Sequence, residues 1–183
     1  MKDTLISRRE FLKDIGMIGA GVLLSASPWL SAFSEVVETS GEKCRLAIIG
    51  PGSRGRFLMS FLVQNPKVEI VALCDIYQPS IEKALELAPK AKVYDDYREI
   101  LEDKTVDAVL VATPLNSHCQ IVLDAFDAGK HVFCEKSIGF TMEECFRIYN
   151  KHISTEKVFF TGQQRLFDPR YIKACLLYTS DAA

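Results

Sequence analysis

The chain has 183 residues, of which 48% are hydrophobic and 25% are charged. This ordinary composition argues against an intrinsically disordered or collagen-like chain, and the formal net charge of -2 gives no electrostatic reason to expect nucleic acid as a partner. The length suits one domain of about 100–150 residues rather than a large two-domain enzyme. The six cysteines form no C-x-x-C pair and show no Cys/His spacing of a zinc site, so we expect no metal centre.

The beginning of the chain has the pattern of an export signal. A basic stretch, S-R-R-E-F-L-K at 7–13, is followed by an apolar stretch at 15–24 and by small residues. The basic string resembles the twin-arginine signal, whose pathway carries folded proteins. We therefore expect residues 1–33 to direct export to the periplasm through the twin-arginine machinery, with 34–43 as a polar linker. The alternatives are a membrane anchor, including an uncleaved signal, or an amphipathic surface helix; the apolar stretch is short for a membrane span.

Short apolar runs alternate with amphipathic segments through the middle of the chain. The apolar, β-branched runs predict strands at 45–49, 68–74, 93–94, 108–112, 131–134 and 158–161. The segments between them predict helices at 54–64, 79–88, 97–102, 116–128 and 141–153. Thr141 and Glu144 form a capping-box pattern at the last of these. Six strands alternating with helices predict an α/β fold with a doubly wound parallel sheet, a Rossmann domain over residues 44–162.

A glycine-rich loop follows the first predicted strand. It reads G-P-G-S-R-G from Gly50 to Gly55, which is G-x-G-x-x-G between a strand and a helix. Gly50 allows a tight turn, Gly52 allows the backbone to approach a pyrophosphate, and Gly55 allows the helix to pack closely on the strand. The N–H groups at the start of the helix, around Ser53 and Arg54, would face the phosphates. We expect a dinucleotide here; the alternative is a plain surface turn.

An acidic residue in the expected position indicates which dinucleotide binds. Asp75 lies twenty residues after Gly55, at the end of the second predicted strand. A carboxylate there accepts hydrogen bonds from the ribose hydroxyls and repels a 2′-phosphate, so NAD is the expected cofactor. Arg54 keeps NADP as the less favoured reading, because its guanidinium could pair with a phosphate.

Two further segments follow the fourth and fifth predicted strands. They read T-P-L-N-S-H at 113–118 and A-G-K-H-V-F-C-E-K-S at 128–137, and both end at the carboxyl edge of the sheet, where open α/β sheets bind ligands. With the glycine loop, the A-T-P-x-x-x-H, A-G-K-H-V and E-K-P positions resemble the glucose–fructose oxidoreductase / inositol dehydrogenase / MocA (Gfo/Idh/MocA) family over residues 43–171.

The resemblance implies a role for Lys136, which matches the family lysine beside the nicotinamide and the substrate. A lysine there holds a substrate hydroxyl or assists proton transfer as hydride leaves carbon. The alternative is an ordinary lysine at a strand end, paired with Glu135. Ser137 stands where the family usually has proline, which restores an N–H group and frees the backbone at that position.

Other polar residues around these segments are weaker candidates. His118 could act as a general base, but we favour a helix-start histidine that packs near the cofactor. Pro114 and Asn116 would line the nicotinamide–ribose side, although Asn116 could be only a helix N-cap. Gln164 is a further nicotinamide-side contact. The predicted cofactor-binding residues are Gly50, Gly52, Ser53, Arg54, Gly55, Asp75, Thr113, Pro114, Asn116, His118, Glu135, Lys136 and Gln164.

The end of the chain has two different characters. Residues 163–173 resemble the start of the family's second, α+β domain, which supplies most substrate contacts and which we expect to be truncated here. Residues 174–183 resemble a translated sequencing-adapter read-through; the alternative is a genuine helix end. We therefore expect this chain alone to be inactive.

The expected function is NAD-dependent oxidation and reduction at a hydroxyl-bearing carbon of a sugar or cyclitol, in a protein that is a homo-oligomer at full length. Export favours a tightly bound cofactor and a redox-neutral cycle, because free NAD is scarce outside the cytoplasm. One alternative is therefore an NAD-dependent glycosidase of the same fold, which oxidises the sugar transiently. Another is a non-catalytic nucleotide-binding protein.

Overall fold

The computed structural model describes residues 43–179. The predicted export signal, nearly all of the predicted linker and the last four residues of the chain lie outside the described residues. Between residues 43 and 179, no helix combines the length and the apolar character needed to cross a membrane.

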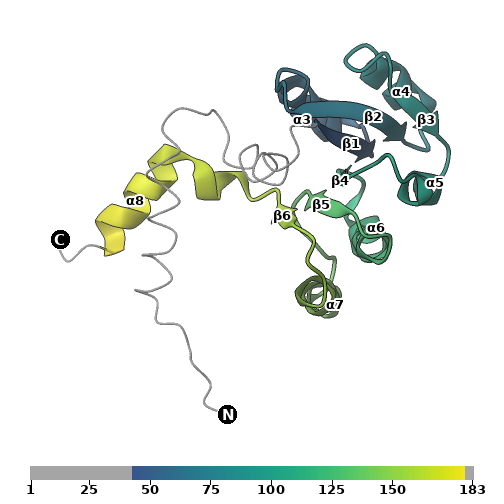
Figure 1. The fold of residues 1–183 in the computed structure, drawn as a ribbon. Coiled ribbons are helices and arrows are strands. Elements are labelled where there is room, and N and C mark those ends of the chain that lie inside the picture. The colour runs from purple at the N-terminus through teal and green to yellow at the C-terminus, as the bar shows by residue number, and fades with distance from the viewer. Residues whose placement is uncertain (1–42, 180–183) are drawn as a thin grey trace.

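Six parallel strands form one sheet in the order β3-β2-β1-β4-β5-β6 (Figure 1). The strands are β1 Cys44–Ile49, β2 Val68–Cys74, β3 Lys92–Tyr94, β4 Ala108–Val111, β5 His131–Cys134 and β6 Phe159–Thr161. The chain starts at the centre of the sheet, moves outward through β2 and β3, and then returns to add β4, β5 and β6 on the other side of β1. The predicted doubly wound sheet is confirmed, and its strand order reverses between β1 and β4.

The helices lie close to their predicted positions. They are α3 Ser53–Leu62, α4 Gln78–Leu85, α5 Tyr97–Glu102, α6 Leu115–Asp127, α7 Met142–Ile153 and α8 Pro169–Thr179, with a 3-10 helix η1 at Gln164–Phe167. Helix η1 is an element that the sequence patterns did not predict. Helix α8 extends away from the sheet beyond β6 (Figure 1) and continues without a break to Thr179.

Alternate residues of each strand face two apolar layers, as expected of a sheet buried on both faces. On one face, Leu46 and Ile48 of β1 pack with residues of α3 and α4. On the other face, Ala47 and Ile49 pack with residues of α5, α6 and α7. Because both faces of the central strands are covered, a ligand can reach these strands at their ends.

Helix α7 begins at the predicted capping box but leaves most of its apolar side chains exposed. Its capping box is present, since Thr141 Oγ1 accepts from the N–H of Glu144 and the Glu144 carboxylate accepts from the N–H of Thr141. The side chain that α7 buries fully is Ile148. Its other apolar residues recur at helical spacing and are exposed, apart from the half-buried Cys145: Met142, Phe146, Tyr149 and Ile153.

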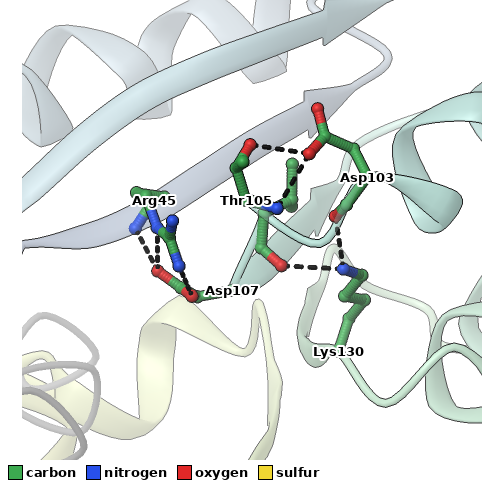
Figure 2. A network of polar contacts seen from close by, with 6 residues as sticks. Arg45, Asp103, Thr105, Asp107 and Lys130 are labelled. Carbon is green, nitrogen blue, oxygen red and sulfur yellow. Dashed lines mark hydrogen bonds and ion pairs between the residues drawn. The ribbon is translucent and has the colours of Figure 1, made fainter.

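A polar network joins the amino-terminal ends of β1, β4 and β5 (Figure 2). Arg45 Nε and Nη2 donate to the two carboxylate oxygens of Asp107, at 3.0 and 2.7 Å. Lys130 Nζ donates to the backbone carbonyls of Asp103 and Val106, at 2.7 and 2.8 Å. The Lys130 side chain is buried, and burial lowers its pKa. The lysine of the A-G-K-H-V segment therefore ties the turn before β4 to the start of β5.

Candidate functional site

The carboxyl edge of the sheet is aligned by backbone hydrogen bonds that continue one residue past the strands. The N–H groups of Gly50, Ala112, Glu135 and Gly162 donate to the carbonyls of Cys74, Ile49, Val111 and Cys134, respectively. The glycine loop, the A-T-P segment and the E-K-S segment, which lie far apart in the sequence, therefore begin side by side at one edge.

The glycine loop has the geometry that its three glycines predict. Gly50 has a φ of +84°, which favours glycine, and a Cβ there would lie 2.7 Å from the Thr113 nitrogen. A Cβ on Gly55 would lie 2.5 Å from the carbonyl oxygen of Gly50, so only glycine lets α3 pack this closely. A Cβ on Gly52 would meet no heavy atom within 4 Å. The backbone at Gly52 is thus open to a ligand at the start of α3, where free N–H groups favour a phosphate.

A cleft of about 830 Å³ runs along this edge beside the loop. Its lining includes Gly50 and Gly52 of the glycine loop, Asp75 after β2, and Pro114 and Asn116 after β4. The volume lies within the range of about 300–1,000 Å³ that is typical of small-molecule and cofactor sites. An extended dinucleotide can therefore lie across the switch point with its phosphates at the glycine loop.

Carboxylates surround the end of this cleft that lies beyond β2. Asp75 and Asp96 line it together with Asp95. Burial, together with the negative charges of Asp96, Asp75 and Asp95, raises the pKa of the neighbouring Cys74 thiol to about 11. This negative field suits ribose hydroxyls and opposes a 2′-phosphate, as the sequence predicted from Asp75 alone.

A smaller cavity of about 320 Å³ adjoins the first at the end of β4, because both are lined by Ala112 and Thr113. Predicted site residues from four separate segments line it: Arg54, Thr113, His118, Glu135, Lys136 and Gln164. The structure therefore brings Lys136 and Gln164 to one cavity, next to the cleft that suits the dinucleotide.

Arg54 makes a contact that the sequence analysis did not predict. Its Nε and Nη2 both lie 2.7 Å from Oε1 of Glu135, 81 positions later in the chain. The other carboxylate oxygen of Glu135 accepts from the N–H of Lys136 at 3.2 Å. The structure thus pairs the Glu135 carboxylate with the Arg54 guanidinium rather than with the Lys136 ammonium group, which was the alternative interpretation.

His118 is held by the backbone on both sides of its ring. Nδ1 lies 2.7 Å from the carbonyl oxygen of Ser137, and Nε2 lies 2.8 Å from that of Thr113. The side chain is buried at the start of α6. With both ring nitrogens engaged, His118 is not placed as a general base and instead joins the loops after β4 and β5. This contact also fixes the loop at Ser137, whose geometry the sequence left open.

Two other positions complete the site. The N-cap of α6 is Pro114, so the alternative reading of Asn116 as an N-cap is wrong; Asn116 lies in the first turn and lines the large cleft. Gly162, which the sequence analysis did not single out, gives room to the Glu135 carboxylate, since a Cβ there would lie 2.8 Å from it. Within residues 43–179, no cluster of three or more His, Cys, Asp or Glu side chains is arranged to hold a metal ion.

Comparison with known proteins agrees with this geometry. The model of an oxidoreductase family with an NAD-binding Rossmann fold matches residues 44–163. The chain belongs to the Gfo/Idh/MocA family. Its fold is the NAD-binding domain of that family, and NAD is the cofactor that the glycine loop and Asp75 fit.

The relatives carry two kinds of name. A glycosyl hydrolase family 109 protein of Stenotrophomonas maltophilia is 34% identical over 162 residues, which are 82% of this chain and 34% of that protein. An α-N-acetylgalactosaminidase of Shewanella oneidensis is 31% identical over 174 residues, 83% of this chain and 38% of that protein. The crystal structure of myo-inositol dehydrogenase from Lactobacillus casei with NAD(H) and myo-inositol has a TM-score of 0.68 and 33% identity, covering 74% of this chain and 42% of that one. The chain thus spans little more than a third of the curated relatives it matches.

Proposed function

We propose that the protein moves hydride between NAD and a hydroxyl-bearing carbon of a sugar or cyclitol. The observation that carries this proposal is the placement of Lys136 in a cavity that adjoins the dinucleotide cleft at the end of β4. Lys136 is exposed, and no ion pair holds it among residues 43–179. Its ammonium group is therefore available to a substrate hydroxyl in the adjoining cavity.

Each part of the edge has a separate task in this proposal. The glycine loop and the start of α3 bind the diphosphate, Asp75 accepts from the ribose hydroxyls, and Thr113, Pro114 and Asn116 line the path toward the smaller cavity. NAD supplies the hydride acceptor when it is bound.

As an ammonium group, Lys136 orients the substrate hydroxyl by donating a hydrogen bond to its oxygen. After releasing a proton to solvent, the neutral amine accepts the hydroxyl proton as hydride leaves the carbon. Gln164 lines the same cavity and contacts the nicotinamide side. His118 acts indirectly, by holding the loops that carry these groups.

A second candidate is an NAD-dependent glycosidase, favoured by the names of the curated relatives. Such an enzyme oxidises the sugar, eliminates the aglycone, adds water and reduces the sugar again, so that NAD is regenerated within one turnover. The two candidates share the hydride step and Lys136. They differ in whether NADH accumulates.

From the sequence of residues 1–33 we propose that the protein is exported. Their pattern fits export through the twin-arginine pathway to the periplasm with NAD already bound. Because the relatives are longer than this chain, we propose that a further α+β domain contributes to the substrate site and to homo-oligomer formation. A frame that continues past Lys173 into such a domain is the expected finding when the surrounding gene is sequenced.

The test is an assay of the longest form that the gene encodes, with cyclitols, free sugars and aryl glycosides as substrates. Accumulation of NADH with a cyclitol or sugar indicates the oxidoreductase, whereas aglycone release that depends on NAD without NADH accumulation indicates the glycosidase. Lys136→Ala should lower either activity by about 10²–10⁴-fold. The matched control is Lys104→Ala, because Lys104 is an exposed lysine away from the site. NAD binding without either activity would leave only a nucleotide-binding role.

A further inference from the structure

Three charged side chains line the 320 Å³ cavity, and two of them are cations that compete for one carboxylate. Glu135 lies between Arg54 and Lys136, and all three line the same cavity. A lysine directly after a glutamate at a strand end can fold back onto it, which was the alternative reading of this segment. Whether Lys136 is free therefore depends on which cation Glu135 holds.

In the structure, the Glu135 carboxylate pairs with Arg54. Two guanidinium nitrogens of Arg54 lie 2.7 Å from one Glu135 oxygen, and the N–H of Lys136 lies 3.2 Å from the other. Planar guanidinium groups form such paired contacts with carboxylates more readily than an ammonium group does.

The burial of the pair is uneven, with 7% of the Glu135 side chain exposed and 38% of that of Arg54. A carboxylate this buried requires a cationic partner, and Gly162 leaves the space in which it sits. Without Arg54, Lys136 is the other charged residue that lines this cavity and can supply that partner.

We propose that Arg54 is a positioning residue that occupies Glu135 and thereby keeps the Lys136 ammonium group free for the substrate. This inference rests on the proposed function for the role of Lys136, but the pairing itself requires neither cofactor nor substrate. It also gives the arginine of the G-P-G-S-R-G loop a task other than binding phosphate. The Arg54–Glu135 pair therefore also joins the glycine loop to the segment after β5 that contains Lys136.

The test measures how fast Lys136 reacts with trace amounts of acetic anhydride, read by mass spectrometry of the full chain, with Lys104 as the internal reference. In Arg54→Gln, Glu135 should recapture Lys136 and slow its labelling about three- to fivefold, because an ammonium group held by a carboxylate is a poor nucleophile. In the double variant Arg54→Gln/Glu135→Gln the competing charge is absent, and the wild-type rate should return. Arg45→Gln removes a similar ion pair at the opposite edge and should leave Lys136 labelling unchanged.

Three outcomes would overturn the inference. Unchanged labelling in Arg54→Gln would show that Glu135 does not capture Lys136, and slow labelling that persists in the double variant would show that Arg54 acts through the fold alone. If Arg54→Gln does not fold, Glu135→Gln gives the answer: the inference predicts the wild-type rate, whereas faster labelling of Lys136 would mean that Glu135 already holds it. Arg54→Lys should keep Lys136 free, since a cation remains at position 54.

These results separate the inference from the proposed function. The labelling pattern can hold while Lys136→Ala remains active, in which case the proposed role of Lys136 fails and the pairing stands. Conversely, loss of activity in Lys136→Ala with unchanged labelling in Arg54→Gln would leave the proposed function intact and remove the role of Arg54.

Discussion

The amino edge and the carboxyl edge of the sheet carry the same types of charged residue, but these residues have different roles at the two edges. Each has an arginine–carboxylate pair at 2.7 Å, Arg45–Asp107 at the amino edge and Arg54–Glu135 at the carboxyl edge. Each also has a lysine beside the pair. At the amino edge Lys130 is buried and bound to two carbonyls (Figure 2), whereas at the carboxyl edge Lys136 faces a cavity.

The difference lies in what remains for a ligand. At the amino edge the cations and anions satisfy one another, and Arg45, Asp107 and Lys130 line neither of the two cavities described above. At the carboxyl edge the pair satisfies Glu135 and leaves Lys136, Asp75 and the open backbone at Gly52 facing two adjoining cavities. The carboxyl edge is therefore the one of the two that presents charged groups to a ligand.

The largest effect is expected when the lysine at the carboxyl edge, Lys136, is replaced, because this substitution affects catalysis. Lys136→Ala should lower kcat in the full-length enzyme by about 10²–10⁴-fold, the range that a positioned acid–base group contributes. The affinity for NAD should change less than about twofold, because Lys136 lines the smaller cavity rather than the large cleft. Steady-state kinetics and an NAD titration measure the two effects, and an equal loss in both would contradict the assignment.

Lys130→Met tests the lysine at the opposite edge. It should lower the free energy of unfolding by about 2–3 kcal/mol, because the carbonyls of Asp103 and Val106 lose a buried charged donor. Activity per folded molecule should not change. Urea unfolding followed by circular dichroism measures the loss, and the exposed Lys104→Met is the control.

Replacing Arg54 should lower the free energy of unfolding more than replacing Arg45 does. Arg54→Gln leaves an almost fully buried carboxylate without its partner and should lower the free energy of unfolding by about 2 kcal/mol. Arg45→Gln leaves Asp107, whose side chain is 37% exposed, and should cost less than about 1 kcal/mol. Equal losses in parallel urea titrations would show that burial does not distinguish the pairs.

The smallest expected effect is on the pH dependence of stability. Burial of Asp107 opposes its ionisation, but the hydrogen bonds and charge of Arg45 outweigh burial and hold the pKa of Asp107 below its usual value of 3.8. The unfolded carboxyl protonates first as the pH falls, so the stabilisation is complete above about pH 4 and disappears below the folded pKa. Because the pair is partly exposed, the effect should be about 0.5 kcal/mol, and Asp107→Asn should remove it from the difference between urea unfolding at about pH 6 and at about pH 3.

Local patterns were enough to predict the sheet, the glycine loop and the position of Asp75. Each depends on neighbouring residues: apolar runs, the spacing of Gly50, Gly52 and Gly55, and the end of β2. The Arg54–Glu135 pair was not predictable, because it joins residues 81 positions apart through the order of the strands.

Helix α7 shows a different limit of sequence patterns. Its apolar spacing is real, but spacing alone does not tell which face of a helix meets the sheet, and here Phe146 and Tyr149 face outward. The contact of His118 with the Ser137 carbonyl was also not predictable, because it depends on how the loop after β5 folds against α6.

The most direct test of the contrast between the two edges is a map of the backbone amides that NAD protects from hydrogen exchange in the full chain. We predict protection at Asp75 and at the non-proline residues of 50–55 and 113–116, with no change around Arg45, Asp103 and Lys130. Protection at the amino edge, or none at the glycine loop, would contradict it.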